Sequence, residues 1–372
     1  MALIRTNLVD RDPWLEKEID TLQRGGYAVT LIAWDRERRP PPKAPLAVSG
    51  YEEKLLRLKA PWGMGVLLVL PIWWSFVFFC VLITRCDIVQ AIDLDSIMPA
   101  EMAARLKGKP VIYQIYDIYV DRRAAPKAIR SIAIFFEKLF MRCATAVQLA
   151  NETQAKEVNG VPNKNVVAVY NPAPDYLKGK NPPAHEKFTI LYAGVLYRSR
   201  GLNIDKVFQA IKDMDGVKLV IAGYGDMEEE IKGWVKDADG KAEFLGRLTY
   251  QQVLEQTIAS DLLFGLYTIS TPTVKYAASA NKLMEAMMAK KPILVTKDTA
   301  MADLVKQEDF GIAVDPENVS EIRQAILALK NDPALYRRYA ENARRAYERT
   351  YNRDVMEERL LGLYAKILTK GE

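Results

Sequence analysis

The residues with the clearest chemical content lie in the run 279–289, which precedes an apolar stretch at 293–295. The pattern predicts a helix whose polar first turn faces a ligand. Free backbone N–H groups and the positive end of the helix dipole favour a phosphate there, and Lys282 adds a full charge. Glu285 follows about one turn later, where its carboxylate could accept hydrogen bonds from the paired hydroxyls of a ribose. A diphosphate and a ribose form the constant part of a nucleotide sugar, so the run predicts a site for one.

A second candidate phosphate site is the loop that follows an apolar strand predicted at 188–194. Gly194 at the strand exit allows the backbone to approach a ligand, and the guanidinium groups of Arg198 and Arg200 can each grip two phosphate oxygens. An exposed basic turn without a ligand is the alternative interpretation of these residues.

A G-x-G turn, Gly223 and Gly225, ends the next predicted strand at 217–222. The pair is a weak signal by itself. Residue Glu228 stands where a dinucleotide-binding fingerprint requires Gly, which argues against a nicotinamide or flavin role.

Two carboxylates close β-like runs in the first half of the chain, Asp93 after 87–92 and Asp117 after 110–116. A carboxylate at such a position could orient or deprotonate an acceptor hydroxyl. It could also simply cap the helix that follows.

Short β-like runs alternate with longer helical patterns along the whole chain, which is typical of α/β proteins with parallel sheets. The prolines of 171–183 interrupt this alternation and predict a linker. We therefore expect two Rossmann-like domains, at 1–180 and 187–351. Open α/β sheets bind ligands at the carboxyl ends of their strands, so the site is expected in a cleft between the domains.

The composition is that of a globular protein, with 49% hydrophobic and 27% charged residues in 372. The three cysteines, Cys80, Cys86 and Cys143, lack metal-ligand spacing, and we expect them to be reduced, as in the cytosol. The single histidine, His185, lies in the predicted linker, which argues against a His-based metal site. We expect neither a metal nor another cofactor.

The net charge of +5 is concentrated in one segment. Residues 101–142 contain nine Lys or Arg against four Asp or Glu. A local basic face of this kind fits an anionic membrane or a phosphorylated substrate better than a nucleic acid.

Residues 62–83 form an uncharged stretch of 22 residues, which is long enough to span a bilayer. A crossing would separate residues 1–61 from the strands with which they must pair, so we reject it. A helix that lies in one leaflet and a core helix without lipid contact remain as alternatives. The membrane interpretation predicts contacts at aromatic, proline and basic positions: Trp62, Pro71, Trp73, Trp74, Phe78, Arg122, Arg123, Lys127 and Arg130.

The run 279–292 resembles the donor-binding helix of the family 4 glycosyltransferases, which have the GT-B fold. In one subfamily this helix reads roughly S-P-N-K-x-x-E-Y-M-A-x-G-K-P-V, and the chain matches it at Asn281, Lys282, Glu285, Met287, Ala289, Lys291 and Pro292. The resemblance covers most of the chain and implies two Rossmann-like parallel-sheet domains that face a central cleft. It also implies a final helix, at 352–372, that packs back onto the first domain. The donor site that it implies consists of Gly194, Arg198, Arg200, Gly223, Gly225, Leu248, Asn281, Lys282, Leu283 and Glu285.

Several positions depart from the family pattern. In the donor-binding helix, Ala280 and Lys290 replace the usual Pro and Gly. Ala278 replaces a second Glu, Val195 replaces an Arg, and Gln90 and Tyr116 stand where relatives usually carry His. The missing histidines weaken the case for a protein base. The resemblance instead implies a retaining mechanism, in which the donor's own phosphate accepts the acceptor proton.

The leading hypothesis is a metal-independent, retaining glycosyltransferase of the hexosyltransferase type. It would move a sugar from a nucleoside diphosphate to a lipid-linked acceptor at the cytosolic membrane face, bound there as a peripheral or monotopic protein. Its catalytic residues would be Asp93, Asp117, Arg200 and Lys282. The alternatives are a catalytically silent scaffold that binds a nucleotide or lipid, and an epimerase or hydrolase of nucleotide sugars.

Overall fold

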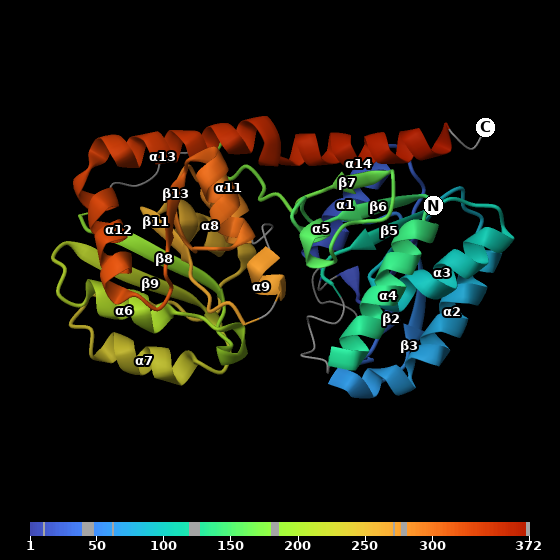
Figure 1. The fold of residues 1–372 in the computed structure, drawn as a ribbon, viewed down its shortest axis with the longest axis horizontal. Coiled ribbons are helices and arrows are strands. Elements are labelled where there is room, and N and C mark those ends of the chain that lie inside the picture. Colours follow the sequence, from blue (N-terminus) through green and yellow to red (C-terminus); the bar gives the residue numbers. More distant parts are fainter. Residues whose placement is uncertain are drawn as a thin grey trace. The chain divides into compact units, whose positions relative to one another are not determined.

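The computed structural model describes residues 1–9, 12–38, 48–61, 63–118, 127–179, 186–270, 272–276 and 281–369. The chain forms two compact units (Figure 1). Unit 1 contains Met1–Val169 and Glu357–Glu372, and unit 2 contains Tyr170–Met356. The division falls before the predicted linker, because residues that follow Val169 pack on unit 2. One such contact joins Asp175 to Arg344, with Oδ2 and Nη2 2.7 Å apart.

Unit 1 is built on a parallel sheet with the strand order β3-β2-β1-β4-β5-β6-β7 among the described residues. The strands are β1 (Ala2–Arg5), β2 (Thr30–Asp35), β3 (Glu52–Arg57), β4 (Val89–Ile92), β5 (Val111–Ile115), β6 (Ala146–Leu149) and β7 (Val166–Ala168). Strands β1, β2, β4, β5 and β6 are buried along their whole length, as expected where helices cover both faces of a parallel sheet.

The helices of unit 1 fill the connections between its strands. They are α1 (Pro13–Arg24), α2 (Leu70–Ile83), α3 (Leu94–Leu106), α4 (Lys127–Cys143) and α5 (Gln154–Glu157), with a 3₁₀ helix, Gly63–Leu68, before α2. Figure 1 shows α2 beside α3 and α3 beside α4, which agrees with the contacts between these helices.

The last helix, α14 (Arg353–Leu368), has most of its length in unit 1. Its Glu357 pairs with Arg24 and accepts a hydrogen bond from Thr21, both on α1. The hydroxyl of its Tyr364 donates to the side chain of Gln90 on β4. These contacts fasten the C-terminal helix to α1 and to the centre of the first sheet.

Unit 2 contains a second parallel sheet, with the order β10-β9-β8-β11-β12-β13 among the described residues. Its strands are β8 (Phe188–Val195), β9 (Val217–Tyr224), β10 (Ala242–Phe244), β11 (Leu262–Gly265), β12 (Ile293–Thr296) and β13 (Gly311–Val314). Its helices are α6 (Ile204–Ile211), α7 (Glu228–Lys236), α8 (Tyr250–Ile258), α9 (Pro272–Tyr276), α10 (Asn281–Met288), α11 (Ala300–Glu308), α12 (Val319–Asn331) and α13 (Pro333–Ala346). The two parallel sheets confirm the predicted α/β class.

Candidate functional site

Helix α10 carries the residues of the predicted donor site. Its apolar side chains are fully buried, which fixes the helix against the sheet of unit 2: Leu283, Met284, Ala286, Met287 and Met288. The side chain of Leu283 is thus part of the core, and the residue could reach a donor only through its backbone N–H. Asn281 at the helix start is exposed, and its Oδ1 accepts a hydrogen bond from Asn171 Nδ2 at 3.3 Å. Ala278 and Ala280, two of the positions that differ from the family pattern, lie outside the described residues.

Lys282 lies against the end of β8. Its Nζ is 4.3 Å from the centroid of the Tyr192 ring, and it also hydrogen-bonds Tyr267. Burial disfavours the charged amine, but the hydroxyls of Tyr192 and Tyr267 and the carboxylate of Glu285 outweigh this effect and raise its pKa. Burial also raises the pKa of Tyr192 to about 12. The amine is therefore held as an ammonium ion beside the hydroxyls of Tyr192 and Tyr267, with the carboxylate of Glu285 nearby.

Gly194 leaves the space that the Lys282 amine occupies. A Cβ atom at residue 194 would lie 2.8 Å from Lys282 Nζ, closer than a normal contact. A side chain at residue 194 would therefore displace the amine from the strand end.

Glu285 is 4% exposed and lies next to the start of α8. The hydroxyl of Tyr250, the first residue of α8, hydrogen-bonds its carboxylate. Burial and the neighbouring Glu285 together raise the pKa of this Tyr250 hydroxyl. Because α8 begins with a capping box at Thr249, the position of Tyr250 is well fixed. The Glu285 carboxylate already accepts a hydrogen bond from one hydroxyl, and it could accept hydrogen bonds from the hydroxyls of a ribose in the same way.

The G-x-G turn has a structural role that needs no ligand. A Cβ atom at Gly223 would lie 1.9 Å from the carbonyl oxygen of Gly194, and one at Gly225 would lie 2.2 Å from that of Leu196. The turns after β8 and β9 therefore pack directly on each other. Leu248, predicted to contact the donor, is half-buried just before α8.

The two arginines of the basic loop differ in their contacts. Arg198 Nη2 is 2.5 Å from Glu230 Oε2, and the Arg198 backbone N–H donates to Asp226. The exposed side chain of Arg200 makes no hydrogen bond or ion pair with any described residue. Of the two, Arg200 is therefore the one whose guanidinium group is available to a phosphate.

In unit 1 the predicted catalytic residue Asp93 is part of a buried ion-pair cluster. Its Oδ2 lies 2.5 Å from Arg5 Nη1, and its Oδ1 accepts the backbone N–H of Tyr116 at 2.9 Å. Arg5 Nε also lies 3.0 Å from Asp12 Oδ2. Asp93 is 2% exposed and does not cap α3 through its side chain, so the capping alternative is wrong. Asp117 is half-buried at the end of β5.

Around this cluster lies a polar network that the sequence reasoning missed. Glu18 on α1 accepts hydrogen bonds from Gln90 Nε2 at 2.6 Å and from Gln114 Nε2 at 2.8 Å. Burial raises the pKa of Glu18. Gln90 and Gln114 lie within apolar runs of the sequence, where amide side chains are unusual because such strands are buried on both faces. These two residues could therefore have indicated the polar network from the sequence.

The predicted membrane contacts need correction. Trp73 is 0% exposed: it stacks on Trp34 with ring centroids 5.6 Å apart, and its Nε1 donates to the Asp95 carbonyl oxygen at 3.1 Å. Trp74 is half-buried and donates to the same oxygen. Trp73 is therefore a core residue, because the indole N–H needs a partner that the core supplies. Phe78 and Arg130 are half-buried and Pro71 is exposed, whereas Trp62, Arg122, Arg123 and the side chain of Lys127 lie outside the described part of the chain.

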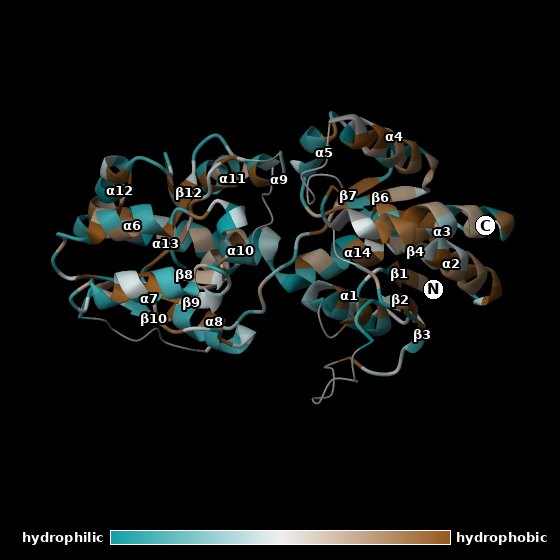
Figure 2. Cartoon of the chain, turned by 90° about the horizontal axis from the view of Figure 1, so that it is seen from below, coloured by the Kyte–Doolittle hydropathy of each residue, from teal (hydrophilic) through white to brown (hydrophobic). Residues whose placement is uncertain are grey.

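A different set of apolar side chains is exposed on the adjacent helices α2, α3 and α4, and we call it the α2–α4 surface. It consists of Ile72, Phe79, Ile83, Met102, Leu106, Ile132 and Phe135, each at least 52% exposed. Figure 2 shows hydrophobic colouring along all three helices. None of the helices in the described ranges is both long and apolar enough to cross a membrane.

No cluster of three or more His, Cys, Asp or Glu side chains within the described ranges could hold a metal ion. The charged groups at the strand ends of unit 2 are instead Lys282, Glu285 and Arg200.

Comparisons with known proteins identify the family. Residues 175–346 match the family "Glycosyl transferases group 1", and residues 16–172 match "Glycosyl transferase 4-like domain". The chain belongs to the group 1 glycosyltransferases of the GT-B fold. It is similar to the alpha-D-kanosaminyltransferase of Streptomyces kanamyceticus, with 21% identity over 286 residues, 72% of this chain and 73% of the relative.

Two solved structures show the same fold over nearly their whole length. Sucrose-phosphate synthase from Thermosynechococcus elongatus superimposes with a TM-score of 0.73 and 16% identity, covering 99% of both chains. Anabaena HepE, solved in complex with UDP, superimposes with a TM-score of 0.70 and 12% identity, covering 98% of this chain and 99% of that one.

Proposed function

We propose that this glycosyltransferase takes its sugar from a nucleoside diphosphate bound at the start of α10. The observation that carries the proposal is the placement of Lys282 and Glu285 on one turn of α10, the amine among phenols and the carboxylate beside a hydroxyl. A diphosphate beside Lys282 would gain a cation and the free N–H groups of the helix start. The ribose would lie beside Glu285. The UDP complex of the structurally similar Anabaena protein supports this donor class.

The reaction in this proposal retains the configuration of the sugar and needs no metal. The bond between the anomeric carbon and the diphosphate breaks, and the diphosphate keeps the electron pair. The acceptor hydroxyl oxygen bonds to the anomeric carbon on the same face, and its proton passes to the departing phosphate. Lys282 and Arg200 stabilise the negative charge that develops on the diphosphate.

The surroundings of Asp93 favour a mechanism in which the donor phosphate, and not the Asp93 carboxylate, takes the proton of the acceptor hydroxyl. Its carboxylate already faces the Arg5 guanidinium and accepts the Tyr116 backbone N–H. In the proposed mechanism Asp93 is a positioning residue that holds the strand ends together. Asp117 remains a candidate for orienting the acceptor hydroxyl.

The proposed acceptor is lipid-linked and is reached at a membrane surface. The α2–α4 surface supports this part of the proposal, because exposed apolar side chains gathered on adjacent helices are typical of an interaction site. The charges around it favour an anionic leaflet: Arg142 is exposed, Glu137 is buried, and the exposed Arg105 is paired with Glu101. The residues proposed to enter the leaflet are therefore the exposed apolar side chains of α2, α3 and α4, and not Trp73.

Titration calorimetry with UDP, GDP and ADP tests the donor site. We expect one nucleotide to bind, and we expect Glu285→Ala to weaken that binding beyond detection. The matched control is Glu229→Ala, which removes a carboxylate that is 87% exposed on α7 and should leave the affinity unchanged. Equal affinity in wild type and Glu285→Ala, with both proteins folded, would exclude the site.

Sedimentation with vesicles tests the membrane part separately. The double variant Ile132→Ser and Phe135→Ser should lose binding to vesicles of phosphatidylcholine with phosphatidylglycerol. Tyr197→Ser, which changes a 40% exposed aromatic residue of unit 2, is the control and should still bind. Failure of the wild type to bind vesicles would remove the membrane acceptor but leave the donor site untouched.

The rival functions differ in their products. An epimerase or hydrolase would release an altered or free sugar without any lipid acceptor, and a silent scaffold would bind nucleotide without turnover. Mass spectrometry of the products formed from the nucleotide sugar that binds best separates these outcomes from glycosyl transfer.

A further inference from the structure

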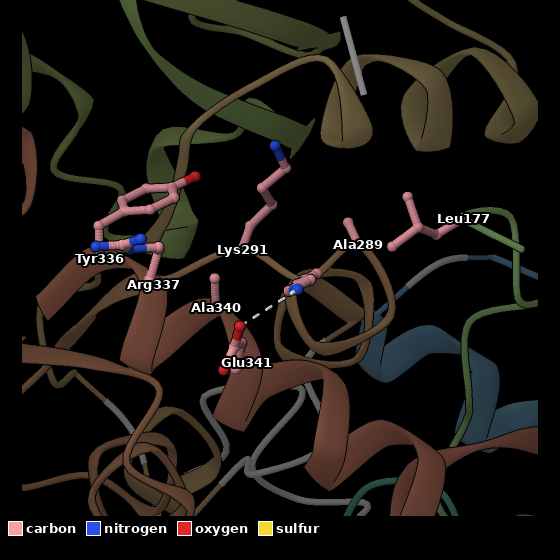
Figure 3. A pocket seen from close by; sticks show the side chains of 8 residues that line it. Leu177, Ala289, Lys291, Tyr336, Arg337, Ala340 and Glu341 are labelled. Carbon is pink, nitrogen blue, oxygen red and sulfur yellow. Dashed lines mark ion pairs between the residues drawn. The ribbon is translucent and has the colours of Figure 1, made fainter. Parts of the chain in front are cut away.

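A pocket of about 430 Å³ lies on unit 2, at the end of α10 opposite to Lys282 (Figure 3). Its walls come from the residues after α10, Ala289 to Lys291, and from Tyr336, Arg337 and Glu341 on α13. Its volume is within the range of small-molecule sites. Because α10 is about 12 Å long at 1.5 Å per residue, the pocket and the proposed donor site do not share residues.

Lys291 is the unusual residue of this pocket. It is 6% exposed, and its amine makes no hydrogen bond or ion pair with the described residues. Burial lowers the pKa of Lys291, and the only charge that opposes this effect is the more distant Asp261. Asp261 is already occupied, since its Oδ2 accepts the backbone N–H of Thr189 at 2.8 Å. A buried ammonium without a close anion is unfavourable, and an anionic ligand would relieve this.

The other charged side chains of the pocket add to this positive potential. Lys290 Nζ is 3.9 Å from Glu341 Oε1, so the one carboxylate of the lining offsets one cation. Lys291 and Arg337 are left to provide two positive charges. Arg337 Nε donates to the Pro333 carbonyl oxygen at 3.2 Å, which holds the guanidinium group at the start of α13.

The pocket also has a wall suited to an organic group. In Figure 3, Lys291 stands between Tyr336 and Arg337 on one side and Ala289 and Leu177 on the other. The hydroxyl of Tyr336 donates to the Asp261 carbonyl oxygen at 3.0 Å, which fixes the orientation of its ring.

We infer that this pocket is a second ligand site, for a small phosphate ester whose dianionic phosphate lies beside Lys291 and Arg337. The two uncompensated cations match the charge of a phosphate monoester, and an arginine with a lysine is a usual pair for such a group. The organic part of the ester packs against Tyr336 and Ala289. The inference does not depend on the proposed donor site.

Titration calorimetry with glycerol 3-phosphate, glucose 1-phosphate and inorganic phosphate tests this inference. All titrations use the Lys282→Ala background, so that phosphate bound at the start of α10 does not contribute. We expect at least one ester to bind more tightly than inorganic phosphate. Lys291→Met should weaken that binding at least tenfold, and Arg337→Gln should weaken it several-fold.

The control variant Lys232→Met removes a 52% exposed lysine of α7 and should bind the ester as the background protein does. Thermal unfolding gives a second measurement: without ligand, Lys291→Met should be at least as stable as the background, and only the background should be stabilised by the ester. No ester binding at millimolar concentration, binding unchanged in Lys291→Met and Arg337→Gln, or inorganic phosphate binding as tightly as every ester would each overturn the inference.

Discussion

Both units place charged side chains at the ends of their parallel strands, but they neutralise these charges in different ways. In unit 1, Arg5 is matched by two carboxylates, Asp93 at 2.5 Å and Asp12 at 3.0 Å. In unit 2, Lys282 faces the phenols of Tyr192 and Tyr267. In the first cluster two carboxylates lie within ion-pair distance of the cation, whereas in the second the nearest groups are two tyrosine hydroxyls and Glu285 acts from one turn along the helix.

The difference separates structural charges from those suited to a ligand. A buried ion pair loses several kcal/mol when one partner is removed, because the other charge is left buried. A cation among neutral hydroxyls can exchange those contacts for phosphate oxygens, which are stronger acceptors. We therefore expect changes in unit 1 to affect stability and changes in unit 2 to affect turnover.

The largest expected effect is that of Arg5→Met on stability. The variant leaves the carboxylates of Asp12 and Asp93 buried without their cation, and we expect a loss of about 3–5 kcal/mol in the free energy of unfolding of unit 1. Hydrogen exchange of β1 and β4 in urea measures it. Arg24→Met, which changes a 52% exposed arginine on α1, is the control and should lose less than about 1 kcal/mol. Similar losses in the two variants would contradict the contrast between buried and exposed pairs.

The converse test in unit 2 is Lys282→Met. We expect kcat to fall by about 100-fold or more, the range found when a group that stabilises developing charge is removed. The stability of unit 2 should fall by less than that of unit 1 in Arg5→Met: the variant loses the contacts with Tyr192, Tyr267 and Glu285 that raise the pKa of Lys282, but it leaves no pair of carboxylates without its cation. Steady-state kinetics and urea unfolding of the same preparations check both statements. A stable fold with unchanged kcat would show that Lys282 does not act on the diphosphate.

The sequence predicted the alternating architecture well, but it missed two strands for physical reasons. Strand β3 reads Glu-Glu-Lys-Leu-Leu-Arg and lies at the sheet edge, half-buried or exposed, so it lacks the apolar signal of a buried strand. Strand β13 begins with Gly311, is half-buried or exposed over its first three residues and is likewise an edge strand. The central strands were recognisable because burial on both faces requires continuous apolar runs.

The candidate site was predictable only where its residues are close in sequence. Lys282 and Glu285 belong to one helix turn, and their spacing could be read directly. Their partners Tyr192 and Tyr250 come from β8 and the start of α8, and no local pattern connects such distant residues. The sequence of α2 alone does not place Trp73, because every face of this helix is apolar, and only the packing on Trp34 and α3 decides which face is buried.

A smaller effect is expected from the basic loop, where the two arginines provide an internal comparison. Arg200→Ala should lower kcat about tenfold, the usual size of one lost hydrogen bond to a charged group. Arg198→Ala should change kcat by less than about twofold, because its exposed pair with Glu230 contributes little. Steady-state kinetics at saturating donor measures both. An equal loss in the two variants would mean that Arg198 also reaches the phosphate.

The smallest effect concerns Asp95, which lies beside the completed cluster of unit 1. Burial, and then the neighbouring Asp93, raise its pKa above the ordinary value of 3.8. The folded protein therefore binds this proton more tightly than the unfolded chain, so a charged Asp95 lowers stability above its folded-state pKa. This unfavourable contribution disappears below pH 3.8, where the group is protonated in both states.

Asp95→Asn should accordingly gain stability relative to wild type as the pH rises above 3.8, until the folded-state pKa is passed. Urea unfolding of both proteins from pH 4 to pH 8 measures the difference, and Asp87→Asn, whose side chain is 80% exposed, is the control and should show no such trend. A difference that stays constant with pH, or that falls as the pH rises, would mean that Arg36 and Arg5 compensate the charge of Asp95. Every carboxylate of the unit 1 cluster would then be matched by an arginine. This would sharpen the contrast with Lys282 of unit 2, whose nearest groups are tyrosine hydroxyls.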